Sequence, residues 1–197
     1  KEEVKTLNET RSTRLLLGIY VPYEIFMTDD INKAVGSDII IIATPSFAVR
    51  ETARLISGIV NNGTIVVSVA KGFEKGTLKQ FTAVIEEELP SKVVALSGPS
   101  HAEEVARKLP TSIVAASKDI AAAERVQKEL STDKFRIYTN ADIIGVEVGA
   151  ALKNIIAVAA GVCYGLGLGD NTIAALSTRG MSEIAELGVK MGAEKTT

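Results

Sequence analysis

Two patterns of hydrophobic residues alternate along the first two thirds of the chain: short β-branched runs, and apolar positions at helical spacing. The run 38–44 contains four consecutive isoleucines and is followed by Pro45. This pattern is typical of a strand buried on both faces in a parallel sheet, so we expect a central strand there. Helical spacing follows over 47–59, and Asn62-Gly63 then breaks the chain before the strand 64–69.

The same cycle continues to residue 138. Helices are predicted over 77–89, 101–107 and 120–130, and strands over 92–96, 112–116 and 135–138. Such alternation with short connections predicts an α/β fold, a Rossmann-like doubly wound parallel sheet. No G-x-G-x-x-G segment follows a strand, so we expect the N-terminal part of this domain to be missing from the sequence.

The periodicity changes near Thr139. Strands disappear, and two helical stretches, 143–164 and 171–192, are joined by the glycine-rich turn 165–169. Because these glycines follow a helix rather than a strand, they are expected to form a connection and not a phosphate-binding loop. The sequence therefore predicts a partial dinucleotide-binding domain over 1–139 and a partial all-helical domain over 140–197, whose C-terminal part is also expected to be missing.

Composition excludes several classes of partner. The 197 residues include 22 Lys and Arg against 24 Asp and Glu, so no basic face remains for nucleic acid or an anionic membrane. The longest apolar run is interrupted by Lys153 and Asn154, which argues against a membrane span, and the N-terminus has no signal-peptide pattern. The single cysteine, Cys163, suits a reducing, cytoplasmic location, and with one histidine it offers no metal site.

Lys153 is the most informative residue, because it interrupts an apolar helix. Its helical neighbours are mostly small: Gly149, Ala150, Ile156 and Ala157. A buried, unpaired ammonium costs several kcal/mol, so this lysine must meet an anion, lose its proton, or extend its stem to water. The last possibility makes Lys153 an ordinary surface residue; the first two make it a candidate proton carrier or electrostatic clamp.

Two further candidates follow neighbouring predicted strands. Lys71 stands after the strand 64–69, at the edge where ligands bind in open α/β sheets, although it could equally be a solvated loop lysine. Gly98-Pro99-Ser100 follows the next strand; its backbone can approach a ligand, and Ser100 with Glu103 also fits a helix capping box. The acidic run 86–88 fits a solvated helix end better than a metal site.

Four separated motifs occur in the order found in the bacterial-type NAD(P)-dependent glycerol-3-phosphate dehydrogenases, which the chain resembles from about Asn8 to its end. They are Ala70-Lys71-Gly72, the segment SGPSHAEEVA over 97–106, the helix segment GVEVGAALKNIIA over 145–157, and GLGLGDNT over 165–172 with Thr178-Arg179-Gly180. The resemblance implies NADH- or NADPH-dependent reduction of dihydroxyacetone phosphate to sn-glycerol 3-phosphate for phospholipid synthesis.

The resemblance also implies roles for particular residues. Lys153 would exchange the proton with the substrate oxygen, and Lys71 would contact both substrate and cofactor. The other implied contacts are Gly98 and Ser100 with the substrate, Ala102 with the cofactor, and Asn154 in support of Lys153. The helical domain is expected to bind substrate, and its surface, rich in Ala and Gly, favours a homodimer. Two alternatives remain open here: a related helix-lysine dehydrogenase of another hydroxy or keto acid, and a non-catalytic dinucleotide-sensing module.

Overall fold

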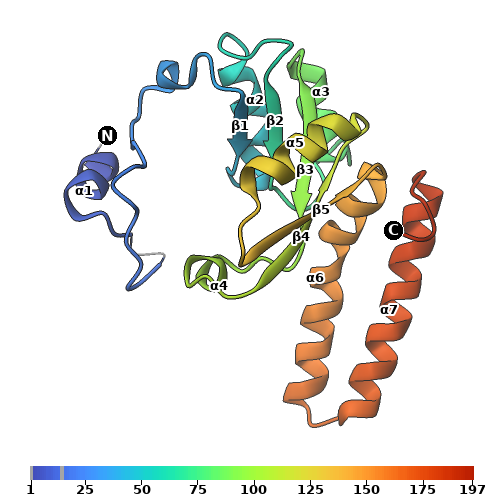
Figure 1. Cartoon of the computed structure of the whole chain (residues 1–197). Helices are drawn as coiled ribbons and strands as arrows, with labels where there is room; N and C mark the ends of the chain where they lie inside the picture. Colours follow the sequence, from blue (N-terminus) through green and yellow to red (C-terminus); the bar gives the residue numbers. More distant parts are fainter. Residues whose placement is uncertain (1, 14–15) are drawn as a thin grey trace.

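Five strands form one sheet in the order β1-β2-β3-β4-β5 in a computed structural model that describes residues 2–13 and 16–197 (Figure 1). The strands are β1 (Ile39–Ile42), β2 (Ile65–Ser68), β3 (Lys92–Ser97), β4 (Thr111–Ala116) and β5 (Phe135–Asn140). Their β-branched and small apolar residues fit a sheet that is covered on both faces. The Rossmann-like α/β fold predicted from the sequence is confirmed.

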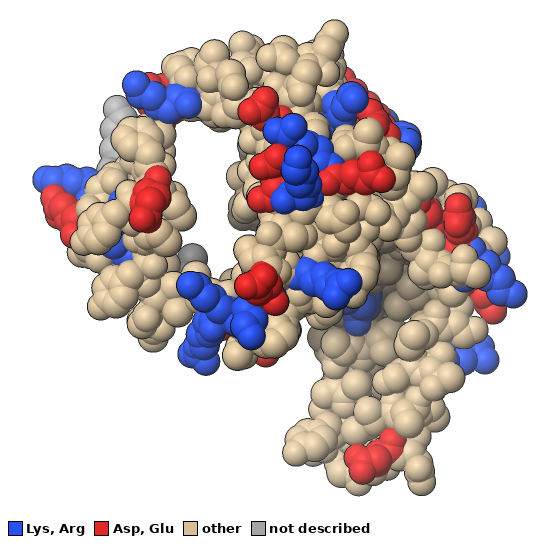
Figure 2. All heavy atoms as spheres, viewed as in Figure 1, with Lys and Arg blue, Asp and Glu red and all other residues tan. Residues whose placement is uncertain are grey.

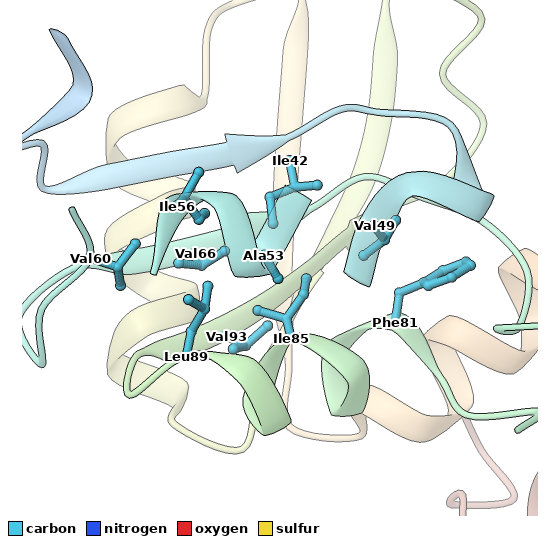
Figure 3. Close-up of a cluster of buried hydrophobic side chains, with 10 residues drawn as sticks. All are labelled: Ile42, Val49, Ala53, Ile56, Val60, Val66, Phe81, Ile85, Leu89 and Val93. Atoms are coloured by element: carbon cyan, nitrogen blue, oxygen red, sulfur yellow. The ribbon is translucent and has the colours of Figure 1, made fainter. Parts of the chain in front are cut away.

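Alternating residues of the strands point to opposite faces of the sheet and belong to two separate hydrophobic cores. Val66 of β2 points toward α2 (Val49–Ile56) and α3 (Phe81–Glu88), where it joins a fully apolar cluster (Figure 3). The next residue, Val67, belongs to the opposite core, which is covered by α5 (Ile120–Leu130). This period of two places one sheet between two helical layers.

One expectation about the sheet was wrong. The segment 38–44 was expected to form a central strand, but β1 lies at the edge: it pairs with β2 alone among the described strands, and Ile41 is 45% exposed. Among the described strand pairs, β3 and β4 alone are antiparallel, and the others are parallel. The short α4 (Ala102–Ala106) lies in the connection between β3 and β4 (Figure 1). This connection stays at one end of the two strands, so β4 runs back beside β3 in the opposite direction.

The N-terminal segment extends away from the sheet. It contains α1 (Glu2–Thr10) and a short 3-10 helix, η1 (Ile31–Ala34), and Figure 2 shows open space between this segment and the body of the protein. Arg11 organises it, because its guanidinium donates hydrogen bonds to the carbonyl oxygens of Val21, Pro22 and Ile25.

A helical hairpin follows the sheet. It consists of α6 (Ile143–Gly165) and α7 (Asp170–Lys190), which pack along each other and project beyond the sheet (Figure 1). Gly180 permits the close approach, since a Cβ there would lie 2.4 Å from the Cδ1 of Ile156. The turn between them uses Gly167 and Gly169 with positive φ, so the glycine-rich segment is a connection, as predicted.

Asp142 holds the base of this hairpin. One of its carboxylate oxygens accepts a hydrogen bond from the Gly145 N–H at 2.9 Å and so caps α6. The other accepts from the Glu194 N–H at 2.8 Å, beyond the end of α7. Asp142 is buried, and both ends of the hairpin therefore meet at one side chain.

The apolar character of α6 is only partly explained by packing. Ile143 at its start packs against Ala95 and Ala116 of the sheet, but Ile155, Val158 and Val162 farther along are exposed. By length and composition alone, α6 could cross a membrane. The face of the projecting hairpin seen in Figure 2 is correspondingly poor in charged side chains. The absence of a membrane partner and the domain boundary after residue 139 stay predictions.

Replacement of Phe81 tests how much the core beside α3 contributes to the stability of the protein. This side chain is 1% exposed and lies among the residues of Figure 3. We expect Phe81→Ala to lower the free energy of unfolding by about 3–5 kcal/mol in urea denaturation, because it leaves a cavity. Phe47→Ala is the matched control: Phe47 is 86% exposed, and its removal should change stability by less than about 0.5 kcal/mol. Equal losses for the two variants would contradict this assignment of the core.

Candidate active site

The loop that follows β2 places Lys71 at the carboxyl edge of the sheet. Lys71 is half-buried, and Gly72 after it has a φ of +116°, a conformation that L side chains rarely adopt. The loop then folds back on itself through an isolated bridge between Phe73 and Gln80, immediately before α3 begins. Lys71 is therefore held between β2 and α3.

Arg50 of α2 fixes the same loop from outside. Its guanidinium donates to both carboxylate oxygens of Glu74, at 2.6 and 2.8 Å. These hydrogen bonds, followed by that of Thr77, lower the pKa of Glu74 to about 2. Arg50 also pairs with Glu87 and Glu88, so the acidic run at the end of α3 is part of an ion-pair cluster rather than simply solvated.

Gly98 comes directly after β3, the strand beside β2, at the same carboxyl edge of the sheet. Only glycine fits here, because a Cβ would lie 2.8 Å from the Cγ2 and 2.9 Å from the backbone Cα of Ile113 in β4. The carbonyl oxygen of Gly98 accepts hydrogen bonds from two lysines. The position was predicted from the sequence as a backbone contact, and its steric reason lies in the antiparallel β3–β4 pair.

Lys153 reaches this edge from α6. It is half-buried, and its Nζ donates a hydrogen bond to the carbonyl oxygen of Gly98 at 3.1 Å. The Nζ of Lys71 donates to the same oxygen at 3.4 Å. Two cations from opposite parts of the sequence therefore share one acceptor. The lysine in the apolar helix does not simply extend into water.

Proximity of the two lysines has an electrostatic cost. Burial, and then the charge of Lys153, lower the pKa of the Lys71 ammonium. The two hydrogen-bond distances hold the nitrogens within about 6.5 Å of each other, where two unit charges repel by about 2–3 kcal/mol at an effective dielectric constant of about 20. An anion, or an oxygen that gains negative charge, would relieve this repulsion.

The remaining predicted residues lie at different distances from this centre. The Ser100 hydroxyl donates a long hydrogen bond, 3.5 Å, to the Gly98 carbonyl oxygen. Its predicted role as a helix cap was wrong: His101 is the N-cap of α4, and the His101 side chain makes no capping hydrogen bond. Ala102 is exposed at the first position of α4. Asn154 is exposed on α6, and within the described residues no hydrogen bond joins it to Lys153.

Sequence reasoning missed a buried contact between α6 and α3. Glu147 accepts hydrogen bonds from both the backbone N–H and the hydroxyl of Thr82. Nearby, the Gln80 side-chain amide donates to the Ile144 carbonyl oxygen at 3.1 Å. A glutamate within the apolar segment 143–165 was the only available signal, and it has the same origin as the signal from Lys153: a charge where the pattern is otherwise apolar.

A Rossmann-like sheet, followed by a helix that brings a lysine to its carboxyl edge, defines a class of two-domain α/β proteins with a ligand site at that edge. Family models identify the member. The model described as NAD-dependent glycerol-3-phosphate dehydrogenase N-terminus matches residues 1–123, and the corresponding C-terminus model matches 142–197. The chain belongs to this family, as its resemblance predicted.

Individual relatives agree with the family models. The chain is 50% identical over 200 residues to "Glycerol-3-phosphate dehydrogenase [NAD(P)+]" of Clostridium acetobutylicum, covering 100% of this chain and 60% of that protein. It is 50% identical over 198 residues to the protein of the same name from Moorella thermoacetica, with 100% and 59% coverage. The chain thus spans about three fifths of the length of these curated relatives.

Solved structures give the same result. A glycerol-3-phosphate dehydrogenase from Coxiella burnetii matches with a TM-score of 0.91 and 32% identity, covering 99% of this chain and 61% of that one. A ketopantoate reductase from Ralstonia eutropha matches with a TM-score of 0.56 and 14% identity, covering 83% and 55%. The second likeness shows the fold alone.

The crowding at Gly98 predicts a stability effect. Gly98→Ala should lower the free energy of unfolding by about 1–3 kcal/mol, because the new methyl group meets the backbone of Ile113 and β3 must shift. Urea denaturation measures the change. Gly161→Ala is the control, since a Cβ at this helical position meets nothing within 4 Å and should stabilise α6 by about 0.4–1 kcal/mol. A neutral Gly98→Ala would contradict the described packing.

The lowered pKa of Lys71 predicts early loss of its charge as pH rises. Competitive labelling with trace acetic anhydride, read by mass spectrometry, should find Lys71 half-deprotonated at a lower pH than Nα-acetyl-lysine in the same sample. Lys153→Met removes the second cause of the shift and should move the pKa of Lys71 upward, though not fully, because burial is the first cause. An unchanged pKa in this variant would mean that the two ammonium groups do not interact.

Proposed function

We propose that the full-length protein catalyses the reversible, NADH- or NADPH-dependent reduction of dihydroxyacetone phosphate to sn-glycerol 3-phosphate. The observation that carries this proposal is the meeting of Lys71 and Lys153 on one carbonyl oxygen at the carboxyl edge of the sheet. The names of relatives at 50% identity support the same reaction. The product would feed glycerophospholipid synthesis.

Lys153 is the proposed proton donor. As a carbonyl carbon is reduced, negative charge develops on its oxygen, and an ammonium within hydrogen-bond reach stabilises that charge and then transfers its proton. Lys71 is the proposed second cation, in contact with both substrate and cofactor. The repulsion between the two groups favours this role, because both gain by approaching a negative oxygen. Gly98 and Ser100 would contact the substrate, and Asn154 would support Lys153.

The residues at the edge fit the nicotinamide end of a dinucleotide. Lys71 and Ala102 follow the neighbouring strands β2 and β3, the location at which dinucleotides bind in open sheets. Ala102 is exposed and has only a methyl group, so it leaves room for a planar ring. When bound, the cofactor would supply the hydride, and Lys71 and Ala102 would orient it.

Two alternatives are weaker. A dehydrogenase of another keto acid would share the lysine helix, but the ketopantoate reductase likeness extends only to the fold. A non-catalytic dinucleotide sensor would not need a half-buried lysine directed at the reacting edge. We further propose a homodimer formed through the helical domain, whose α6 surface is largely apolar, and a cytoplasmic location without a nucleic-acid or membrane partner.

The test is turnover of dihydroxyacetone phosphate by the full-length protein. Turnover is measured as the oxidation of NADH and, separately, of NADPH. We expect Lys153→Ala to reduce kcat by about 10²–10⁴-fold, the usual contribution of a general acid, while fluorescence titration finds cofactor affinity largely kept. Lys190→Ala, on the exposed end of α7, is the control and should leave kcat unchanged. Turnover only of an unphosphorylated keto acid would favour the first alternative. Full activity in Lys153→Ala would contradict the proposed role.

A further inference from the structure

Glu147 is a buried acid that the proposed reaction does not use. It lies in the second turn of α6, is 6% exposed, and has no cationic partner within the part of the chain that the structure describes. Its Oε1 accepts from the Thr82 N–H at 3.1 Å, and its Oε2 accepts from the Thr82 hydroxyl at 2.5 Å. Burial raises the pKa of Glu147, and the hydrogen bonds from Thr82 oppose that rise. Burial of such a group is costly, so the contact requires a reason.

The contact caps a helix that has no cap of its own. Gln80 is the N-cap of α3, but its side chain makes no capping hydrogen bond and instead donates to Ile144 of α6. The free N–H groups and the positive dipole of the α3 N-terminus then face Glu147. A carboxylate from α6 therefore satisfies, across the two parts of the protein, the donors that a local residue normally satisfies.

This contact joins the elements that carry the two lysines. Lys153 lies six residues after Glu147 on the same helix, about 9 Å along its axis. Lys71 lies in the loop that ends where α3 begins. The contact between Glu147 and Thr82 thus links α6 directly to the far end of the Lys71 loop. A shift of α6 along α3 would change the distance of the Lys153 Nζ from the Gly98 carbonyl, which both lysines now share.

We propose that Glu147 is a positioning residue, which keeps Lys153 aligned with Lys71 over the Gly98 carbonyl by capping α3 through Thr82. This inference rests on the proposed function. It assigns Glu147 an effect on the chemical step rather than on cofactor binding, because the proton must be delivered within hydrogen-bond reach. Displacement by about 1 Å can reduce a rate by about 10²-fold.

The experiment compares four single variants of the full-length protein with the wild type. Glu147→Gln keeps the size of the side chain but loses the charge, and Thr82→Val removes the hydroxyl without changing shape. We expect each to lower kcat by about 10–100-fold, with KM for the cofactor within about twofold. Thr82→Ser restores the hydroxyl and should restore at least half of the wild-type kcat. Glu186→Gln, an exposed carboxylate on α7, is the matched control and should retain full activity.

The double variant separates positioning from independent damage. If Glu147 acts through Thr82, Glu147→Gln combined with Thr82→Val should lower kcat little more than either change alone. Crystal structures of Glu147→Gln and of Thr82→Val should show the Lys153 Nζ more than 3.5 Å from the Gly98 carbonyl oxygen, against 3.1 Å here. If Glu147→Gln does not fold, Thr82→Val and Thr82→Ser carry the same comparison.

Several results would overturn the inference. A kcat unchanged in Glu147→Gln and Thr82→Val, with only the melting temperature lowered, would make the contact purely structural. Multiplicative losses in the double variant would mean that the residues act separately. Should Lys153→Ala lose turnover while Glu147→Gln keeps it, the proposed function stands and this inference fails. A wild-type protein that never reduces dihydroxyacetone phosphate would refute both.

Discussion

The carbonyl oxygen of Gly98 accepts hydrogen bonds from Lys71 and Lys153, and the architecture around the site converges on this shared acceptor. This arrangement requires a glycine after β3, because Ile113 occupies the space where a Cβ of residue 98 would lie. It also requires a folded loop after β2 and a helix from the second part of the chain. Holding two ammonium groups together costs free energy, and the surrounding contacts compensate by fixing each element separately.

Local patterns predicted the elements better than their arrangement. The helix predicted over 120–130 coincides with α5, because its apolar positions repeat at a clear helical period and Asp119 caps its start. The position of β1 at the edge and the antiparallel direction of β4 could not be predicted in this way. Both depend on which strands become neighbours, and a β-branched run contains no information about its partner. Strand direction follows from the path of the connection through α4, which is set by tertiary packing.

The candidate site shows the same division. Lys71, Gly98 and Lys153 could be found because each breaks a local pattern beside a strand end or within an apolar helix. Arg50 and Thr82 could not, since a charged residue on a helix surface and a threonine in a first turn are ordinary in isolation. Their importance comes from partners 24 and 65 positions away. The residues that hold the predicted site in place are therefore recognised only when distant segments are seen together.

The hairpin of α6 and α7 is attached to the sheet at one end, where Asp142 joins the start of α6 to Glu194. Farther along α6, Glu147 bonds to Thr82 and Lys153 bonds to Gly98, so the first half of this helix is tied to α3 and to the sheet. The segment 154–165 then extends about 18 Å beyond Lys153, from the rise of an α-helix. Lys153 therefore stands at the boundary between the anchored and the projecting parts of the hairpin.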